Sequence, residues 1–351
     1  MSLARIRRTY GDAGVTGLVP DEDGVVGRVT DDTQLTLFTA EGCLLGHVRG
    51  KDVGIPGATT ALVRDAYLRW IDTQTHTSPP APGSTPHRTG LLRGERWLYA
   101  RRAPGNACLT GLSEGYFPRL PDDLDGKPGP VNPASKGCGA VMRSAPFGFF
   151  CDDAARAFEL AARCAQLTHG HPTGYYSAGA FAATIRYLVE GDSLPDAALR
   201  ALDLLARYPG HEETTAAVRK AVALAADGEA SPARLETLGL GWIAEEALAI
   251  AIYAALARPQ PQGSGRDVNG TPADPGPPSA PIEAVYLLAI NHSGDSDSTG
   301  SICGNLLGTL HGDERLPQRW LAEIEGRETI ASLADDCAAE LRPGEHRPCE
   351  S

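Results

Sequence analysis

The sequence is short of positive charge and has no long hydrophobic run. Its 351 residues include 32 Lys and Arg against 44 Asp and Glu, which gives a formal net charge of −12. This acidic balance provides no basic surface for an anionic membrane and disfavours nucleic acid as a partner. No apolar segment approaches the roughly 18–20 residues that span a bilayer, and the N-terminus lacks the apolar stretch of a secretory signal. We therefore expect a cytoplasmic protein with no membrane partner.

The sequence also lacks cysteine pairs of the C-x-x-C type. None of its eight cysteines is spaced in this way, so a zinc knuckle is disfavoured. A chain of this length needs no disulfide to support a small core, and its 42% of hydrophobic residues suffice for a large one. We expect most cysteines to be reduced, buried, small apolar residues.

Strand-type alternation is scarce, and helical periodicity is common. From Asp32 the apolar positions include Leu35, Phe38 and Leu45, close to a period of 3.6. The same pattern predicts further helices over residues 153–168, 177–190, 195–207, 212–226, 242–257 and 282–290. The segment 242–257 is apolar nearly all round, which predicts a central, buried helix. The sequence therefore predicts an all-α fold, with residues 1–351 forming a single domain.

Two stretches interrupt the helical pattern. Residues 73–90 and 258–280 are rich in Pro, Gly and polar side chains, which is typical of mobile surface loops. The second stretch separates two apolar helices that we expect to pack together, so it is interpreted as a dispensable insertion and not as a domain boundary.

Two acidic clusters each stand at the beginning of an apolar helical segment. They read "TDDT" at 30–33 and "GDSDS" at 294–298. A helix N-terminus tolerates carboxylates, so two N-caps remain one interpretation. However, a cap needs a single side chain, whereas two carboxylates and a hydroxyl, present twice, suit a pair of Mg²⁺ or Mn²⁺ ions. An EF-hand is disfavoured because Leu306 stands at the twelfth loop position, where a bidentate Glu is needed.

Two further stretches have features of a ligand site. In "SKGCGAVMR", residues 135–143, Gly137 and Gly139 let the backbone approach a ligand closely. Arg143 could pair with a phosphate or support the loop through a carboxylate, and a plain glycine turn remains the alternative. His169 in "LTHGHPTGYY" stands at a helix end, where it is either a cap or a catalytic residue.

Together these stretches resemble the ADP-ribosylglycohydrolase family. "TDDT" is similar to the family's first metal motif and "GDSDS" to its second, which usually reads G-D-x-D-T. Residues 135–143 resemble its ribose- and phosphate-binding loop, and residues 167–175 a further segment that faces the substrate. The motifs keep the family's order from residue 30 to 308. The resemblance implies a compact, orthogonal helical bundle with a two-metal cleft.

The resemblance also implies an activity and a site. The activity would be metal-dependent hydrolysis of the N- or O-glycosidic bond in an ADP-ribosylated protein or small molecule, which releases ADP-ribose. The cofactor would be two Mg²⁺ ions, with Mn²⁺ as the alternative. Asp31 and Asp32 would be catalytic and would help to activate the attacking water. The implied metal ligands are Thr30, Asp31, Asp32, Asp295, Asp297 and Ser298. The implied substrate-binding residues are Ser135, Lys136, Gly137, Cys138, Gly139 and His169.

Three departures from the family pattern matter. Cys138 replaces the usual Asn, and Ser298 replaces the usual Thr, with Thr299 as a fallback ligand. The family's first helix, with G-D-A-x-G and a nearby glutamate, has no clear match. "GDAG" at 11–14 lacks a preceding apolar helix, and Glu41 is expected to face away from the metals. We therefore expect ADP-ribose binding with slow hydrolysis. The alternatives are a non-catalytic ADP-ribose-binding or regulatory protein and a two-metal phosphoester hydrolase.

Overall fold

The computed structural model describes residues 1–53, 58–81, 90–113, 123–257 and 280–342. Within these ranges it contains fifteen α-helices, four 3₁₀ helices and no β-strand. One isolated bridge joins Gly137 to Ile243. The all-α prediction is confirmed.

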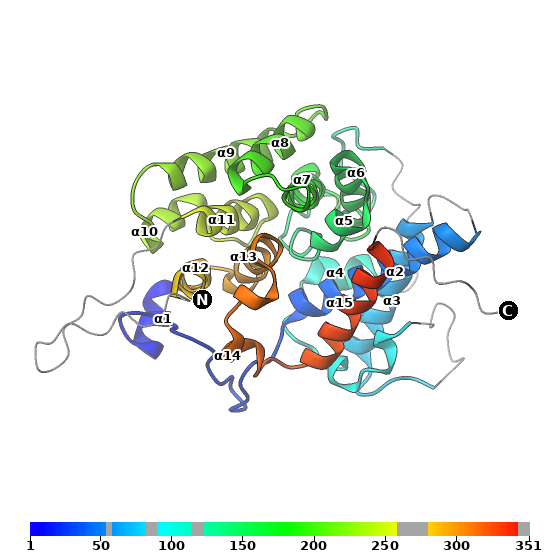
Figure 1. Cartoon of the computed structure of the whole chain (residues 1–351), viewed down its shortest axis with the longest axis horizontal. Helices are drawn as coiled ribbons and strands as arrows, with labels where there is room; N and C mark the ends of the chain where they lie inside the picture. The colour runs from blue at the N-terminus through cyan, green and yellow to red at the C-terminus, as the bar shows by residue number, and fades with distance from the viewer. Residues whose placement is uncertain (54–57, 82–89, 114–122, 258–279, 343–351) are drawn as a thin grey trace, which may run out of the picture.

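The helices of the described ranges are arranged as Figure 1 shows. Their bounds are α1 Leu3–Tyr10, α2 Asp31–Val53, α3 Thr59–Thr75, η1 Leu92–Gly94, η2 Arg96–Leu98, α4 Asn106–Gly111, α5 Ala145–Phe150, α6 Ala154–Ala165, α7 Pro172–Val189, α8 Leu194–Leu205, α9 Glu212–Ala226, α10 Pro232–Leu235, η3 Glu236–Leu238, α11 Ala244–Leu256, α12 Ala280–Ile290, α13 Ser296–His311, η4 Asp313–Arg315, α14 Gln318–Leu321 and α15 Arg327–Leu341.

The predicted helices are present, and the largest error is at the beginning of α7. This helix begins at Pro172, whereas the apolar period predicted a beginning at 177. Pro172 favours the first turn because its fixed φ suits a helix and its missing N–H would have no partner there. The side chain of His171 accepts a hydrogen bond from the Thr173 amide and caps this end. A capping signal, and not hydrophobic periodicity, therefore sets the boundary.

Helix α11 is the central, buried helix that the sequence predicted. All but one of the residues from Ala244 to Tyr253 are buried, and Glu246 is the exception. In Figure 1 the helix lies among α7, α9, α12 and α13, and it contacts each of them. A helix that is apolar on every side is stable only when it is surrounded in this way.

A glycine stripe allows α13 to pack closely on α12. A Cβ atom added at Gly300 would lie 2.8 Å from Ile290, and one at Gly304 would lie 3.2 Å from Tyr286. Gly308 faces open space, with nothing within 4 Å. Two of the three glycines thus explain the close approach, and this packing fixes the N-terminus of α13, where the second acidic cluster lies.

The structure also bears on the predicted loops, cysteines and membrane segments. Residues 73–75 belong to α3, so the first predicted loop is wrong at its beginning, while residues 82–89 and 258–279 lie outside the described residues.

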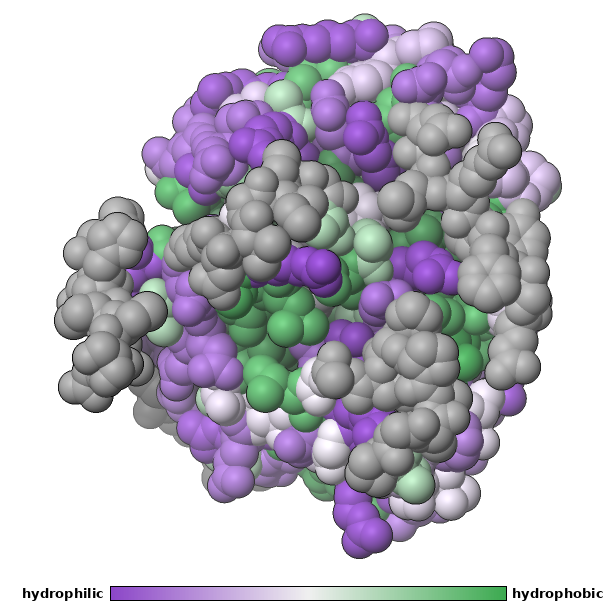
Figure 2. Space-filling model, turned by 90° about the vertical axis from the view of Figure 1, so that its right-hand side faces the viewer, coloured by the Kyte–Doolittle hydropathy of each residue, from purple (hydrophilic) through white to green (hydrophobic). Residues whose placement is uncertain are grey.

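The seven cysteines in the described ranges are all free, and five of them are buried. Among the described helices, none combines the length and hydrophobicity needed to cross a membrane. On the face drawn in Figure 2, hydrophilic residues prevail at the upper and lower edges, and hydrophobic ones gather near the centre.

Candidate functional site

The two acidic clusters meet in one cleft of about 320 Å³. Helices α2 and α13 contact each other, and their N-terminal turns form two walls of the cleft. The other walls come from the glycine loop before α5, the turn before α4 and the segment before α11. The lining residues are Asp31, Asp32, Ala103, Gly105, Asn106, Ala107, Gly137, Cys138, Gly139, Met142, His169, Trp242, Asp295, Asp297 and Ser298.

Three carboxylates converge at the junction of α2 and α13. One oxygen each from Asp31, Asp32 and Asp297 lies within 4.8 Å of the other two. Asp31 and Asp32 are buried, whereas Asp297 is exposed. The Thr30 hydroxyl donates a hydrogen bond of 3.1 Å to Oδ2 of Asp32. In the described part of the chain, the buried Oδ1 of Asp32 has no hydrogen-bond partner.

Burial in the cleft raises the pKa of Asp31 and of Asp32. Burial, with a smaller contribution from the charge of Asp297, raises the pKa of Asp31 to about 7. A hydrogen bond of 3.3 Å from the Gly105 amide opposes this rise. Burial and the charges of three neighbouring aspartates raise the pKa of Asp32 well above its usual value. Carboxylates that are costly to ionise when buried together are stabilised by a bound cation.

Asp295 is the N-cap residue of α13 and has a sulfur neighbour. The Cys138 thiol donates a hydrogen bond of 2.9 Å to Oδ2 of Asp295. The Ser298 hydroxyl lies 3.5 Å from the same sulfur atom. Burial, followed by the interactions with Asp297, raises the pKa of Asp295 to about 8.

Ser298, and not Thr299, faces the cleft. The Thr299 hydroxyl donates to the carbonyl oxygens of Ala289, at 2.8 Å, and Asp295, at 3.0 Å, and it lies 2.9 Å from Nε2 of His292. These bonds hold the Thr299 side chain away from the cleft, which it does not line. The prediction of Thr299 as a fallback metal ligand is therefore wrong.

The glycine loop is held in place from behind by the segment before α11. The Cys138 amide donates to the Trp242 carbonyl oxygen at 3.2 Å, and the Ala244 amide donates to that of Lys136 at 2.8 Å. A Cβ atom at Gly139 would lie 2.9 Å from the Cys108 sulfur and 3.1 Å from the His169 ring. A larger residue at 139 would therefore push the loop out of position.

Four of the six predicted substrate-binding residues line the cleft, and two do not. Gly137, Cys138, Gly139 and His169 are in the lining. Ser135 is half-buried at the beginning of the loop. The ammonium of Lys136 forms ion pairs with Glu213, at 2.6 Å, and with Glu245, at 2.7 Å. Lys136 thus lies beside the cleft, where these ion pairs hold its side chain.

Arg143 supports the loop, but not in the predicted way. It is fully buried. Its guanidinium donates a hydrogen bond of 2.7 Å to the Thr168 hydroxyl and contacts the Cys108 sulfur at 3.5 Å. Its guanidinium carbon lies 4.3 Å from the centre of the Tyr67 ring. The prediction of a phosphate or carboxylate partner is wrong, because the side chain turns into the core behind the loop. From there its charge lowers the pKa of Asp31 and of His169.

His169 is a neutral residue in the cleft wall. Burial, followed by the charge of Arg143, lowers its pKa to about 3. Its Nδ1 lies 2.7 Å from the Thr168 hydroxyl, and its Nε2 faces Gly137 and Gly139. A neutral imidazole can donate or accept a hydrogen bond, depending on its tautomer.

Comparison with known proteins decides the family. A family model described as ADP-ribosylglycohydrolase matches residues 1–347. The chain belongs to the ADP-ribosylglycohydrolase family. It is 28% identical over 219 residues to ADP-ribosylhydrolase ARH3 from Homo sapiens and 26% identical over 252 residues to the Bos taurus protein of that name. These alignments cover 57% and 66% of this chain, and the same shares of the two relatives.

Two further likenesses cover more of the chain. An uncharacterised protein from Archaeoglobus fulgidus is 25% identical over 338 residues, which are 95% of this chain and 88% of that protein. A solved structure, described as an ADP-ribosylglycohydrolase-related protein complex, matches with a TM-score of 0.55. That match has 22% sequence identity and covers 89% of this chain and 82% of the other. It supports the all-α fold of this family member.

Sequence reasoning missed part of the lining in this member of the ADP-ribosylglycohydrolase family. The turn at residues 103–107 lies against α2, because the Asp31 amide donates a hydrogen bond of 3.0 Å to the Arg102 carbonyl oxygen. Its Pro104-Gly105 pair is a turn signal that could have been noticed. Trp242 is 54% exposed at the cleft, although it is a large aromatic residue. Its position just before the apolar helix α11 was the available signal.

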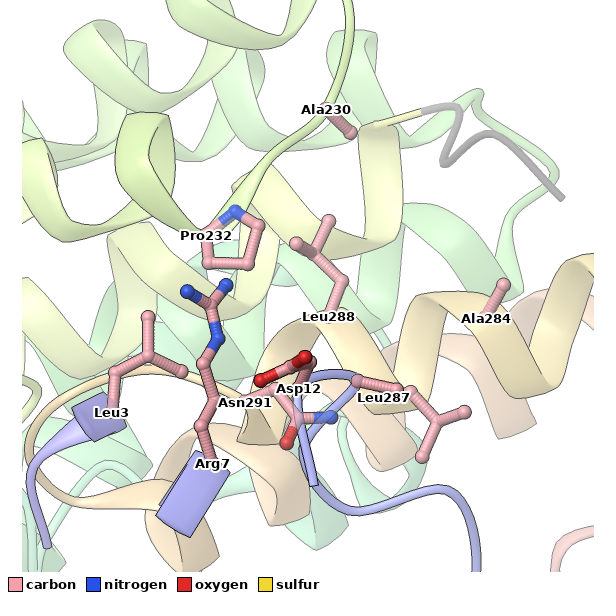
Figure 3. A pocket seen from close by; sticks show the side chains of 10 residues that line it. Leu3, Arg7, Asp12, Ala230, Pro232, Ala284, Leu287, Leu288 and Asn291 are labelled. Carbon is pink, nitrogen blue, oxygen red and sulfur yellow. The ribbon is translucent and has the colours of Figure 1, made fainter. Parts of the chain in front are cut away.

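A second cavity of about 280 Å³ lies between α1, α10 and α12 in this member of the family (Figure 3). It contains Asp12 of the "GDAG" stretch, and the Asn291 side chain beside it bonds the backbone of Val15. Helix α1 precedes this stretch, but it is rich in arginine and Ile6 is its single buried residue, so it is not an apolar helix. Glu41 accepts hydrogen bonds from Arg69 and lines neither cavity. Neither "GDAG" nor Glu41 thus joins the acidic cleft.

Proposed function

We propose that this chain is a metal-dependent hydrolase that releases ADP-ribose from an ADP-ribosylated protein or small molecule. The observation that carries this proposal is the convergence of Asp31, Asp32 and Asp297, from two helices, within 4.8 Å in an open cleft. Family membership and the two ADP-ribosylhydrolases among the relatives support the same reaction.

The donor set of the cleft fits hard divalent cations. Carboxylate and hydroxyl oxygens are the ligands that Mg²⁺ and Mn²⁺ prefer, and the buried, unpartnered Oδ1 of Asp32 is an oxygen that a cation would satisfy. We assign two ions to the cleft. The proposed ligands are Thr30, Asp31, Asp32, Asp295, Asp297 and Ser298. When bound, the ions supply Lewis acidity and lower the pKa of water.

The reaction needs a base and a site for developing positive charge. We assign Asp31 or Asp32 as the base, because a carboxylate oxygen at the cleft wall can accept the proton of the attacking water. The oxygen of that water bonds to C1 of the ribose as the bond from C1 to the substrate nitrogen or oxygen breaks, and the leaving atom takes up the proton that the base removed from the water. The sugar becomes cation-like in the transition state, and the carboxylate cluster stabilises that charge.

The glycine loop and Trp242 suit the rest of ADP-ribose. Gly137 and Gly139 allow the backbone to approach phosphate and ribose closely, since neither carries a side chain. His169, which is neutral, provides one hydrogen-bonding nitrogen between them. Trp242 is half-exposed and presents a flat apolar surface on which a base can stack.

Product analysis tests the proposal. An ADP-ribosylated protein is incubated with the chain, with and without Mg²⁺, and the small products are separated. Free ADP-ribose that depends on Mg²⁺ supports the proposal, whereas AMP identifies a phosphoester or pyrophosphate hydrolase. Binding of ADP-ribose without any product identifies the non-catalytic alternative.

A pair of variants at buried and remote aspartates controls this experiment. Asp31→Asn removes the proposed base, and loss of a general base typically lowers the rate by about 10²–10⁴-fold. Asp12→Asn changes an aspartate of the second cavity and should leave the rate unchanged. Equal activity in both variants would exclude Asp31 from the reaction.

A further inference from the structure

The N-terminal turns of three helices meet beside Lys136 of the glycine loop. The second residue of each helix takes part, namely Thr173 of α7, Glu213 of α9 and Glu245 of α11. The Lys136 ammonium donates hydrogen bonds of 2.6 Å to Glu213 and 2.7 Å to Glu245. The Thr173 hydroxyl donates one of 2.7 Å to the same oxygen of Glu213. Lys136 therefore joins the loop to α9 and α11 directly, and to α7 through Glu213.

Lys136 is bonded to α11 through both its backbone and its side chain. The Ala244 amide donates a hydrogen bond of 2.8 Å to the Lys136 carbonyl oxygen. The next residue, Glu245, accepts the bond from the ammonium. In addition, a Cβ atom at Gly174 of α7 would lie 3.2 Å from the Lys136 Cα atom. The backbone of the loop at Lys136 thus has little room to move.

The burial of Glu245 makes this link hard to break. The residue is 6% exposed, and its Oε2 atom has no hydrogen-bond partner among the described residues. Removal of the lysine would leave a buried carboxylate without its cation, which is costly. The Glu213 side chain, by contrast, is 55% exposed, so water can replace Lys136 there. The ion pair with Glu245 is thus the stronger of the two constraints on the loop.

We propose that Lys136 and Glu245 are positioning residues, whose ion pair holds residues 137–139 of the loop in the shape that binds ADP-ribose. This inference rests on the proposed function. Lys136 does not line the cleft, whereas residues 137–139 follow it directly and do line it. Lys136 therefore acts through the loop and does not touch the substrate.

The link affects binding and not the chemical step. The proposed base and metal ligands stand at the N-termini of α2 and α13, and neither helix takes part in the contacts of Lys136 described above. A binding loop that already has its bound shape loses less conformational entropy when the ligand arrives. Loss of the ion pair should therefore raise the Kd for ADP-ribose and the KM for the substrate, with little change in kcat.

Calorimetric titration with ADP-ribose tests the inference in a double-mutant cycle. Lys136→Met and Glu245→Gln should each weaken binding by about tenfold, since residues of one ion-pair network are coupled on this scale. The double variant should bind no more weakly than either single variant, because both changes break the same link. Lys136→Arg keeps the cation and should retain most of the affinity. Lys127→Met is the matched control, because Lys127 pairs with Asp125 at the surface and does not line the cleft.

Turnover of an ADP-ribosylated protein separates positioning from direct contact and from catalysis. KM should rise in Lys136→Met and in Glu245→Gln, and kcat should stay nearly unchanged, which is the pattern of lost binding. A loss of affinity in Lys136→Met but not in Glu245→Gln would show that the lysine touches ADP-ribose itself, and would overturn the inference. A fall in kcat with an unchanged KM would also overturn it.

The double variant keeps the test valid if a single variant unfolds. It leaves no buried charge without a partner, so it should fold even where a single variant does not. Wild-type affinity in the double variant would overturn this inference, while Mg²⁺-dependent release of ADP-ribose would still stand. A wild type that binds no ADP-ribose would instead contradict the proposed function, and this inference with it.

Discussion

The backbone amide of Cys138 donates a hydrogen bond of 3.2 Å to the carbonyl oxygen of Trp242. This bond links the glycine loop to the residue whose indole stands half-exposed at the cleft. The backbone of Trp242 is thereby fixed, although its side chain is open to solvent. A large exposed aromatic residue on a fixed backbone is a feature of binding surfaces more than of a core.

Trp242 should report the binding of ADP-ribose. We expect the ligand to quench its fluorescence, and Trp242→Leu to weaken binding by roughly 5–150-fold, because a base stacked on an aromatic ring contributes about 1–3 kcal/mol. Fluorescence titration and calorimetry measure both effects. Trp320→Leu is the matched control, since that indole packs near Tyr286 and does not line the cleft. An unchanged affinity in Trp242→Leu would remove this residue from the binding site.

Divalent metal should raise the melting temperature. Carboxylates that repel one another in the native cleft lose that repulsion when a cation binds, and a ligand at about 100 times its Kd adds about 2.7 kcal/mol of stability. Thermal melts with EDTA, Mg²⁺ and Mn²⁺ measure the rise. The double variant Asp295→Asn, Asp297→Asn should lose the rise, and Asp12→Asn should keep it. A wild type that melts at the same temperature with saturating metal would contradict the site.

His169 should make the protein less stable in acid. Its pKa is about 3 in the folded protein against an ordinary value of 6.5. The unfolded chain therefore binds the proton more readily. Stability from this residue is present above pH 6.5 and is lost as the pH falls towards 3. The loss should approach about 1.4 kcal/mol per pH unit within this window.

A comparison with His169→Gln isolates this effect. Urea unfolding of the wild type and the variant at a series of pH values gives the difference in their free energies of unfolding. That difference should shrink from pH 7 to pH 4.5, because the variant lacks the titrating group. A difference that stays constant with pH would show that His169 is not a buried, neutral residue.

One substitution made at two glycines should have opposite effects. Gly294 has a φ of +123°, and a Cβ atom there would lie 1.9 Å from the Leu240 carbonyl oxygen. Gly294→Ala should therefore cost at least the roughly 1–3 kcal/mol of a strained backbone position. Gly308, inside α13, faces open space, so Gly308→Ala should stabilise by about 0.5–1 kcal/mol.

Urea denaturation measures both glycine variants. Metal binding should also weaken in Gly294→Ala, because Gly294 directly precedes Asp295, and should persist in Gly308→Ala. Similar stabilities in the two variants would contradict the described turn before α13.

Much of the fold could be predicted because helical periodicity is a local property. Residues 212–226 were predicted as a helix, and α9 has these bounds. The buried character of α11 followed from a segment with no polar face. The beginning of α7 was not predicted, since it depends on a proline and a histidine cap and not on apolar spacing.

The site could be predicted only where its residues are close in sequence. The stretches at 30–33 and 294–298 each contain their own carboxylates, so they were found. The turn at 103–107 and Trp242 join the cleft through hydrogen bonds to distant segments, which no local pattern encodes. Ser298 and Thr299 differ by one position on a helix, about 100° apart in direction. Tertiary packing of α13 on α12 decides which of the two faces the cleft.

The separation of the cleft walls along the chain has a consequence for folding kinetics. Cys138 and Asp295 touch although they are 157 residues apart, and contacts of such high contact order form late because they close long loops. The helices between them, α7 and α11, can associate before α13 docks against α2. Metal affinity would then appear only with the last docking step. Measuring metal binding during refolding would show when α13 docks, independently of the gain in helix content.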